Sequence, residues 1–262
     1  AKIFERHGGG ERILSVAASY ERRFNIRFDS FVYFDADLLA RLHAPGPIPD
    51  VVPASAADRR VIDQMATITT VANLAGQTDD DRLRYLRALE EIFGRLADSP
   101  AAAAGGADLV VAPQREGRIL AERIGCLPAA GGSWTPQAKR MAVDGGLLVG
   151  FDHRPARRVN GQVTVVDGVI ASGVTLMAAL QLVAAPGATV DLFTCHATAA
   201  GAHALQRYAE RLGVRLTLRI GHVSGRLNGH FYAVDPDHGD RLVLGDIGDT
   251  ISPIVDGSGL PR

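Results

Sequence analysis

From Asp108 onward, short runs of β-branched residues alternate with helical segments, and this alternation constrains the fold more than any other feature. Strand-like runs separated by helical patterns predict a parallel sheet covered by helices. Ligands of such sheets bind beyond the carboxyl ends of the strands, so the loops after the strands are where functional residues are expected. We expect strands over 109–112, 162–166, 189–195 and 215–220, and helices over 117–125, 175–184 and 199–212.

The first hundred residues give weaker signals. Phe28, Phe31 and Tyr33 occupy a possible strand, and the prolines between positions 45 and 49 break any regular element. Two later segments carry apolar residues at helical spacing, and Asp79 to Asp81 suit the start of the second of them. We expect a strand over 26–34, helices over 35–42, 58–75 and 79–96, and a linker over 100–106.

The composition excludes several classes of protein. A net charge of −1 gives no general attraction to nucleic acid or to an anionic membrane. No apolar stretch has the length of a signal peptide or a membrane span. Cys126 and Cys195 form no disulfide framework, and the eight histidines match no zinc-binding spacing. We therefore expect a cytoplasmic protein with two buried thiols and no metal held by the protein alone.

One strand-to-helix connection carries the clearest chemical signal. The run Val163 to Val166 leads into Asp167, then a loop of small residues containing Ser172, Gly173 and Thr175, and then a helix. Backbone N–H groups and hydroxyls at a helix N-terminus favour an anion, and a glycine allows close approach to the backbone. The loop lacks the Gly-Lys-[Ser/Thr] of a P-loop and the Gly-x-Gly-x-x-Gly of a dinucleotide site. It predicts a sugar-phosphate site; a connecting loop that binds nothing is the alternative.

A second loop follows the strand over 109–112. It reads Pro113-Gln114-Arg115-Glu116-Gly117 and precedes another helix. Because the protein is nearly neutral, a phosphate ligand needs a local cation, and the donor fork of arginine suits one. Arg115 is the candidate; an exposed arginine at a helix start is the structural alternative.

Several ordered motifs together resemble the type I phosphoribosyltransferases, and most of all the uracil phosphoribosyltransferases. The second loop is similar to the family's Pro-x-x-Arg-x-Gly turn, with one residue less in the spacing, and Asp167 to Thr175 is similar to its single-acid signature loop. The segments Arg226-Leu-Asn-Gly-His230, Phe231-Tyr-Ala-Val234 and Leu244-Gly-Asp-Ile-Gly-Asp249 are similar to motifs near the family's C-terminus.

The resemblance implies the domain organisation. It covers residues 58–254, and it implies a type I phosphoribosyltransferase-like α/β fold whose parallel sheet is flanked by helices. An N-terminal extension over 1–57 would precede a phosphoribosyltransferase domain over 58–262. That domain would comprise opening helices over 58–98, a core sheet over 108–220 and a C-terminal hood over 221–254.

The resemblance also implies the site. Asp167 would hold the ribose hydroxyls of phosphoribosyl pyrophosphate, Arg115 and Arg140 would contact its pyrophosphate, and Asp246 would lie near the ribose or its Mg²⁺. These four are the implied catalytic residues. The implied contacts to the donor are Arg115, Arg140, Asp167, Gly168, Val169, Ile170, Ala171, Ser172, Gly173, Val174, Thr175 and Asp246; those to the base are Ala233, Val234, Gly245, Asp246 and Ile247.

The implied activity is transfer of ribose 5-phosphate to uracil or a related nucleobase-like acceptor, by a homodimer that binds no nucleic acid. The chain departs from the family at Gly168 and Val174 of the loop, and in the hood at Asp235 and in an insertion over 235–241, which leaves the acceptor open. Two alternatives remain: a regulator of the same fold that binds a nucleotide or the donor without turnover, and an unrelated α/β sugar-phosphate enzyme. Arg157 and Arg158 lie between the motifs and are either part of a flap or a solvated basic pair.

Overall fold

A five-stranded parallel sheet forms the centre of the computed structural model, which describes residues 10–46, 87, 100–114, 116–127, 132–143, 145–223, 226–227, 233–235 and 241–242. The strand order is β3-β2-β6-β7-β8, and every neighbouring pair is parallel. The strands are β2 (Leu109–Val111), β3 (Ser133–Trp134), β6 (Gln162–Ile170), β7 (Thr189–Ala197) and β8 (Arg215–Val223). Runs of Val, Leu and Ile suit strands buried on both faces, so the expected α/β class is confirmed.

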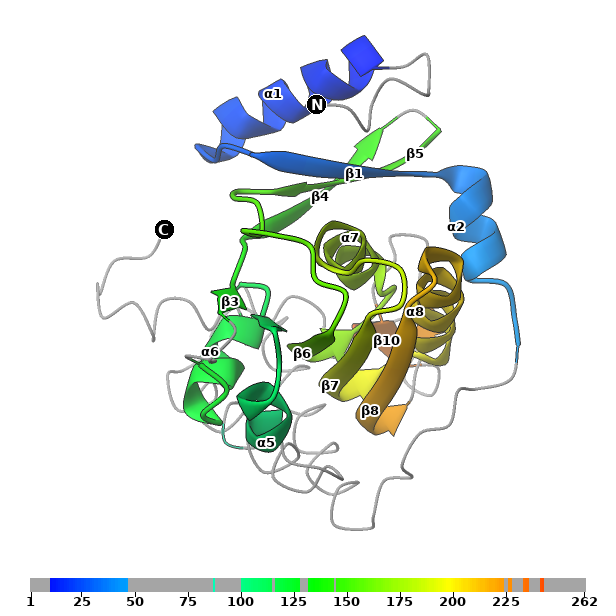
Figure 1. Ribbon diagram of the computed structural model, residues 1–262. Helices are drawn as coiled ribbons and strands as arrows, with labels where there is room; N and C mark the ends of the chain where they lie inside the picture. Colours follow the sequence, from blue (N-terminus) through cyan, green and yellow to red (C-terminus); the bar gives the residue numbers. More distant parts are fainter. Residues whose placement is uncertain are drawn as a thin grey trace.

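Three helices connect these strands, as the alternation predicted. They are α6 (Glu116–Arg123), α7 (Val174–Val183) and α8 (Ala199–Leu212). The bounds of α8 match the expectation because both ends carry strong local signals. Thr198 accepts a hydrogen bond from Gly201 N, and Gly213 ends the helix with a left-handed φ of 69°. Figure 1 shows α7 and α8 on one side of the parallel sheet, and α5 and α6 on the other.

The expectation of a linker over 100–106 is wrong, because α5 (Pro100–Gly105) is a helix. Proline is well tolerated at the first helical position, where its missing N–H has no partner to lose. The four alanines that follow are the strongest helix formers. The proline and the run of alanines therefore favour a short helix over a flexible linker.

A second sheet lies above α7. It contains β1 (Ser30–Asp35), β4 (Ala138–Val143) and β5 (Gly146–Phe151) in the antiparallel order β1-β5-β4. The helix α1 (Gly10–Phe24) packs against β4 on its outer side (Figure 1). The sequence analysis missed α1 and the β4–β5 hairpin, and placed the start of β1 four residues too early. The N-terminal residues thus supply one strand of a sheet whose other two strands lie within the expected phosphoribosyltransferase domain.

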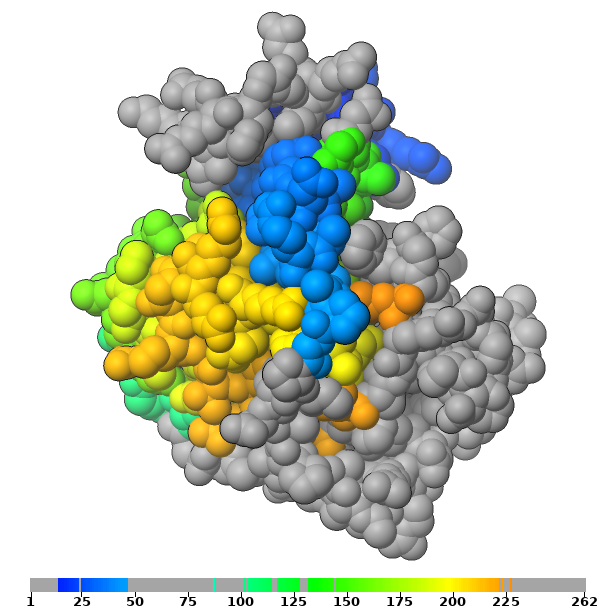
Figure 2. Space-filling model, turned by 90° about the vertical axis from the view of Figure 1, so that its right-hand side faces the viewer, coloured from blue at the N-terminus to red at the C-terminus, as the bar shows by residue number. Residues whose placement is uncertain are grey.

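The second helix of the N-terminal segment, α2 (Ala36–Leu42), docks on α8. Asp35 caps it by accepting a hydrogen bond from Leu38 N at 2.7 Å. At its other end, Nη1 of Arg207 in α8 donates to three main-chain carbonyls, of Arg41 (3.0 Å), Leu42 (3.2 Å) and Ala44 (2.8 Å). The last carbonyls of a helix have no partner within it, so one guanidinium both completes α2 and ties it to α8. Figure 2 shows this segment lying across the surface of α8.

The helix α7 is apolar on nearly every side, and its position explains why. Seven of its residues are buried, and it contacts β1, β4 and β5 as well as α8. A helix that is hydrophobic all round is stable in water only when it is covered all round. Because α7 lies between the two sheets (Figure 1), both of its faces belong to one hydrophobic core.

A third, small sheet follows the parallel sheet in the sequence. It contains β9 (Arg226–Leu227), β10 (Ala233–Asp235) and β11 (Arg241–Leu242) in the antiparallel order β11-β10-β9. The rest of the expected hood, and the helices expected over 58–75 and 79–96, lie outside the described residues. The division at residue 57 therefore stays a prediction. Within the described ranges, no helix is both long and apolar enough to cross a membrane. Cys126 and Cys195 are buried free thiols, as expected.

Candidate functional site

The loop after β2 lies beside β6 at the residue directly before Asp167. The strands β2 and β6 are neighbours, with Val111 opposite Val165. At the start of α6, Gly117 packs on β6, where an added Cβ would come within 2.6 Å of the carbonyl oxygen of Val166. Only a glycine allows that approach. The loop that carries Arg115 therefore passes directly beside Asp167, although Arg115 itself lies outside the described residues.

Asp167 lies within β6 and not after it. The strand was expected to end at Val166, but it continues to Ile170 because β7 extends alongside it, pairing Asp167 with Thr194 and Ile170 with Ala197. The carboxylate is half-buried, and its Oδ1 accepts a hydrogen bond from the main-chain N–H of Gly168 at 2.9 Å. A rigid strand therefore holds this acid at the sheet edge.

The loop after β6 is held from below by α8 and α2. Thr198 Oγ1 donates to the carbonyl of Ala171 at 2.5 Å, and a ring nitrogen of His43, Nε2, lies 2.9 Å from the carbonyl of Ser172. In a trans peptide the C=O and N–H groups point in opposite directions. The N–H groups of Ser172 and Gly173 consequently point away from α8 and α2.

Gly173 is required by packing against the protein itself. Its φ is 72°, and an added Cβ would lie 2.9 Å from Cγ of Leu205 and 3.0 Å from the carbonyl oxygen of Gly201, both in α8. The sequence analysis explained this glycine by close approach to a phosphate. The neighbour that demands it in the structure is α8, which no local pattern could have identified.

The other residues of the loop are placed as follows. Ser172 is buried, and its Oγ accepts from the N–H of Val174 at 3.4 Å, so a phosphate contact by this hydroxyl stays a prediction. The side chain of Val174 is fully buried in the core. Its bulk therefore lies in the core and not on the outer side of the loop, although the family has a glycine at this position. Thr175 is partly exposed in the first turn of α7.

The remaining predicted site residues lie in the other two sheets or outside the described residues. Arg140 lies in β4, opposite Val149 of β5, and so belongs to the antiparallel sheet. Ala233 and Val234 lie in β10. Gly245, Asp246 and Ile247 lie outside the described residues. The roles of all six stay predictions. Arg158 donates to the carbonyl of Ala184 at the C-terminus of α7, which is a structural contact.

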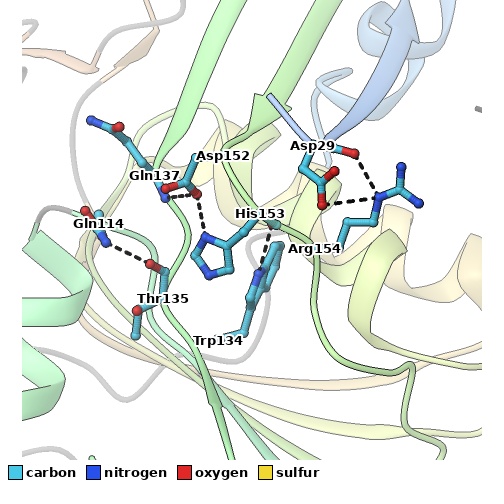
Figure 3. A network of polar contacts seen from close by, with 8 residues as sticks. All are labelled: Asp29, Gln114, Trp134, Thr135, Gln137, Asp152, His153 and Arg154. Atoms are coloured by element: carbon cyan, nitrogen blue, oxygen red, sulfur yellow. Dashed lines mark hydrogen bonds and ion pairs between the residues drawn. The ribbon is translucent and has the colours of Figure 1, made fainter. Parts of the chain in front are cut away.

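A polar network that the sequence analysis missed lies beside the second loop (Figure 3). The carboxylate of Asp152 accepts from the main-chain N–H of Gln137 at 2.9 Å and lies 2.7 Å from Nδ1 of His153. The indole N–H of Trp134 donates to the carbonyl of His153 at 3.2 Å. The only available signal was an Asp-His pair directly after an apolar run; nothing local connects it to Trp134 or Gln137.

No three residues among His, Cys, Asp and Glu gather into a metal-binding group within the part of the chain that the structure describes. Among the described residues, Asp167 is a half-buried carboxylate directly after Val166, on which the second loop packs. One carboxylate does not hold Mg²⁺ by itself, but Mg²⁺ commonly binds through one or two carboxylates together with substrate phosphates and water.

Comparison with known proteins gives matches among solved structures alone: no family model and no curated protein matches the chain. The AQ2163 protein from Aquifex aeolicus is 16% identical, with 77% of this chain and 97% of that chain covered and a TM-score of 0.47. Orotate phosphoribosyltransferase from Aeropyrum pernix is 15% identical, over 55% and 77% of the chains, with a TM-score of 0.33.

Adenine phosphoribosyl transferase from Trypanosoma brucei, in complex with AMP, pyrophosphate and ribose-5-phosphate, is 12% identical over 78% of this chain and 96% of that chain, with a TM-score of 0.38. Solved phosphoribosyltransferases are thus among the structures that this chain resembles. At these TM-scores the likeness assigns no activity to this chain, whose function has to be argued from its own residues.

Proposed function

We propose that the protein is a phosphoribosyltransferase that transfers ribose 5-phosphate from phosphoribosyl pyrophosphate to uracil or a related heterocycle and releases pyrophosphate. One observation carries the proposal: the acid of β6 and the loop that bears Arg115 are adjacent at the carboxyl edge, with Gly117 packed on Val166. This is the edge where ligands of parallel sheets bind. Motifs 50 residues apart would meet there on one donor molecule.

The loop over 171–175 is suited to a phosphate. The carbonyls of Ala171 and Ser172 are engaged by Thr198 and His43, so their partner N–H groups face the other way. Directly behind them begins α7, whose N-terminal end favours negative charge. Because the carbonyls are fixed, no reorganisation is needed before an anion binds. We assign the 5-phosphate to this loop.

The chemistry requires fixed charges and no protein nucleophile. When pyrophosphate leaves, positive charge builds on the ribose ring and negative charge on the leaving group. A carboxylate at the ring and cations at the pyrophosphate stabilise this separation more than they stabilise the bound donor. We assign Asp167 to the ribose hydroxyls and Arg115 to the pyrophosphate, with Arg140 and Asp246 as further members of the site.

Mg²⁺ fits this assignment because it would bind together with the substrate. Asp167 would provide a ligand to the ion or hold the ribose hydroxyls beside it. When bound, Mg²⁺ neutralises part of the charge of the diphosphate. The backbone around Ala233, Val234 and 245–247 would contact the acceptor base. A homodimer working in the cytoplasm remains our expectation for the assembly and its location.

The test is a turnover assay with the whole protein. Phosphoribosyl pyrophosphate and Mg²⁺ are mixed with a panel of pyrimidine and purine bases, and pyrophosphate release is measured. We expect release with one class of base, which identifies the acceptor as well. Tight donor binding without release under any base would replace the enzyme by a regulator of the same fold. Absence of donor binding would refute the proposal.

A further inference from the structure

Asp152 and His153 follow directly after β5, and hydrogen bonds hold both residues in place. Asp152 exchanges two main-chain contacts with Gln137: its N–H donates to the carbonyl of Gln137 at 3.1 Å, and its carboxylate accepts from the N–H of Gln137 at 2.9 Å. The ring of His153 stands edge-on to Trp134, with ring centroids 6.3 Å apart at 79°. The carboxylate and the imidazole are therefore both held in place before any ligand binds.

The geometry determines which nitrogen of His153 is available. A carboxylate only accepts hydrogen bonds, so the hydrogen on Nδ1 points to Asp152 at 2.7 Å. The neutral ring then carries no hydrogen on Nε2, and the protonated ring carries a second N–H there. The side chain is 47% exposed. Protonated His153 thus presents one outward donor with a positive charge behind it.

The pair lies on the side of the site assigned to the pyrophosphate. The segment that holds it runs beside the second loop: Gln114 donates to the carbonyl of Pro136 at 2.8 Å through its main chain, and to that of Thr135 at 3.0 Å through its side chain (Figure 3). The next residue of that loop is Arg115. His153 therefore lies beside the described part of the second loop, at the β3 end of the parallel sheet.

The charged neighbours of His153 among the described residues support the same choice. Asp152 holds the ring, and the next residue, Arg154, is engaged by Asp29, with its Nε 2.8 Å from the main-chain oxygen and 3.5 Å from a carboxylate oxygen. The ring of His153 is half-exposed and lies near Gln114 and Thr135 (Figure 3), so an anion at the second loop is within its reach.

We propose that His153, positioned by Asp152, is a binding residue for the diphosphate group at the carboxyl edge of the parallel sheet. This rests on the proposed function and extends it, because it adds a cation to a leaving-group site assigned to arginines. Nε2–H of the imidazolium donates to a diphosphate oxygen, while Nδ1–H remains on Asp152.

The test is the binding of inorganic pyrophosphate with Mg²⁺, measured by titration calorimetry at pH 6. The proteins are the wild type, His153→Gln, Asp152→Asn and the matched control Arg154→Gln. We expect His153→Gln to bind about tenfold more weakly than the wild type. Asp152→Asn should lose part of the same affinity, and Arg154→Gln should bind as the wild type does.

Equal affinity of the wild type and His153→Gln would overturn the inference, as would an equal loss in Arg154→Gln. Equal melting temperatures of the variants exclude a purely structural effect. If the wild type turns over phosphoribosyl pyrophosphate while His153→Gln binds pyrophosphate normally, this inference alone fails. If no base is turned over, the proposed function fails.

Discussion

Single residues at the carboxyl edge are held by contacts that differ in kind. Asp167 is fixed by the pairing of β6 with β7, whereas Gly173 is fixed by its left-handed backbone and by the side of α8. The first position carries a half-buried charged group at the sheet edge. The second leaves no room for a side chain. The two positions therefore give opposite predictions, one for activity and one for stability.

For Asp167→Asn we expect loss of transfer activity with the fold intact. An asparagine retains the shape and can still accept from Gly168 N–H, but it cannot stabilise positive charge on the ribose ring. Removal of one such electrostatic contact typically lowers kcat by about 100- to 1000-fold. Steady-state pyrophosphate release and circular dichroism measure the two effects. A wild-type rate would show that the site is wrongly placed.

For Gly173→Ala we expect a less stable protein. A non-glycine residue in the left-handed region costs about 1–2 kcal/mol, and the added Cβ would also overlap Leu205 and Gly201. Gly187→Ala is the matched control, because Gly187 also has a positive φ of 88° but no atom within 4 Å of the added Cβ. Urea denaturation should show the larger loss for Gly173→Ala. Equal losses would mean that α8 does not constrain the loop.

Among the elements, α8 contacts α7, α2, β8 and β9. It supplies Thr198 under the phosphate loop, Arg207 to α2, and Tyr208 to α7. The local signals of α8 predicted its bounds but not these partners. Two predictions concern the contacts that α8 makes.

Arg207→Lys should loosen α2. Nη1 contacts the carbonyls of Arg41, Leu42 and Ala44, and Nη2 contacts that of Pro45. A lysine keeps the charge but has one terminal nitrogen on a differently shaped side chain, so it cannot make both sets of contacts. We expect a loss of about 1–3 kcal/mol in the free energy of unfolding and faster proteolysis near residues 43–46. The control is Arg211→Lys, one turn further along α8 and exposed. Equal effects of the two variants would contradict the docking described here.

Tyr208 should make stability depend on pH in the alkaline range. Burial raises the pKa of Tyr208 to about 12, and its hydroxyl hydrogen-bonds to Oε1 of Gln181 in α7. The folded protein thus holds the phenol proton more tightly than the unfolded chain. The stabilisation is complete below pH 10 and is lost as the pH rises toward 12, by about 2–3 kcal/mol. In Tyr208→Phe this loss should be absent; an unchanged pH dependence would refute the assignment.

At the scale of the whole molecule, the N-terminal strand and the parallel sheet share one core. Phe34 of β1 is fully buried and its ring lies 5.4 Å from that of Tyr208 in α8. The helix α7 is covered by the parallel sheet on one face and the antiparallel sheet on the other. The two sheets should therefore unfold together, although the resemblance placed β1 and the parallel sheet on opposite sides of a boundary at residue 57.

Phe34→Ala tests this cooperativity. Truncation of a buried phenylalanine typically costs about 3–5 kcal/mol, and we expect the loss to appear equally in circular dichroism and in the fluorescence of Trp134, which lies in the parallel sheet. Leu14→Ala is the control, because Leu14 is 53% exposed and its truncation should change little. A Trp134 transition that Phe34→Ala leaves unmoved would show two independent units.

The sequence by itself determined four of the five strands of the parallel sheet, their connecting helices and the positions of the two loops, because strand periodicity, helix caps and the Gly-Ser loop are local properties of the chain; it missed the short strand β3. It made Asp167 a candidate because an acid between a strand and a small-residue loop is a local pattern. The tertiary structure alone decided that β6 continues past Asp167, that Gly173 faces α8, and that Asp152 and His153 meet Gln137 and Trp134. Each of these contacts joins residues distant in sequence, and such contacts depend on which surfaces are buried together.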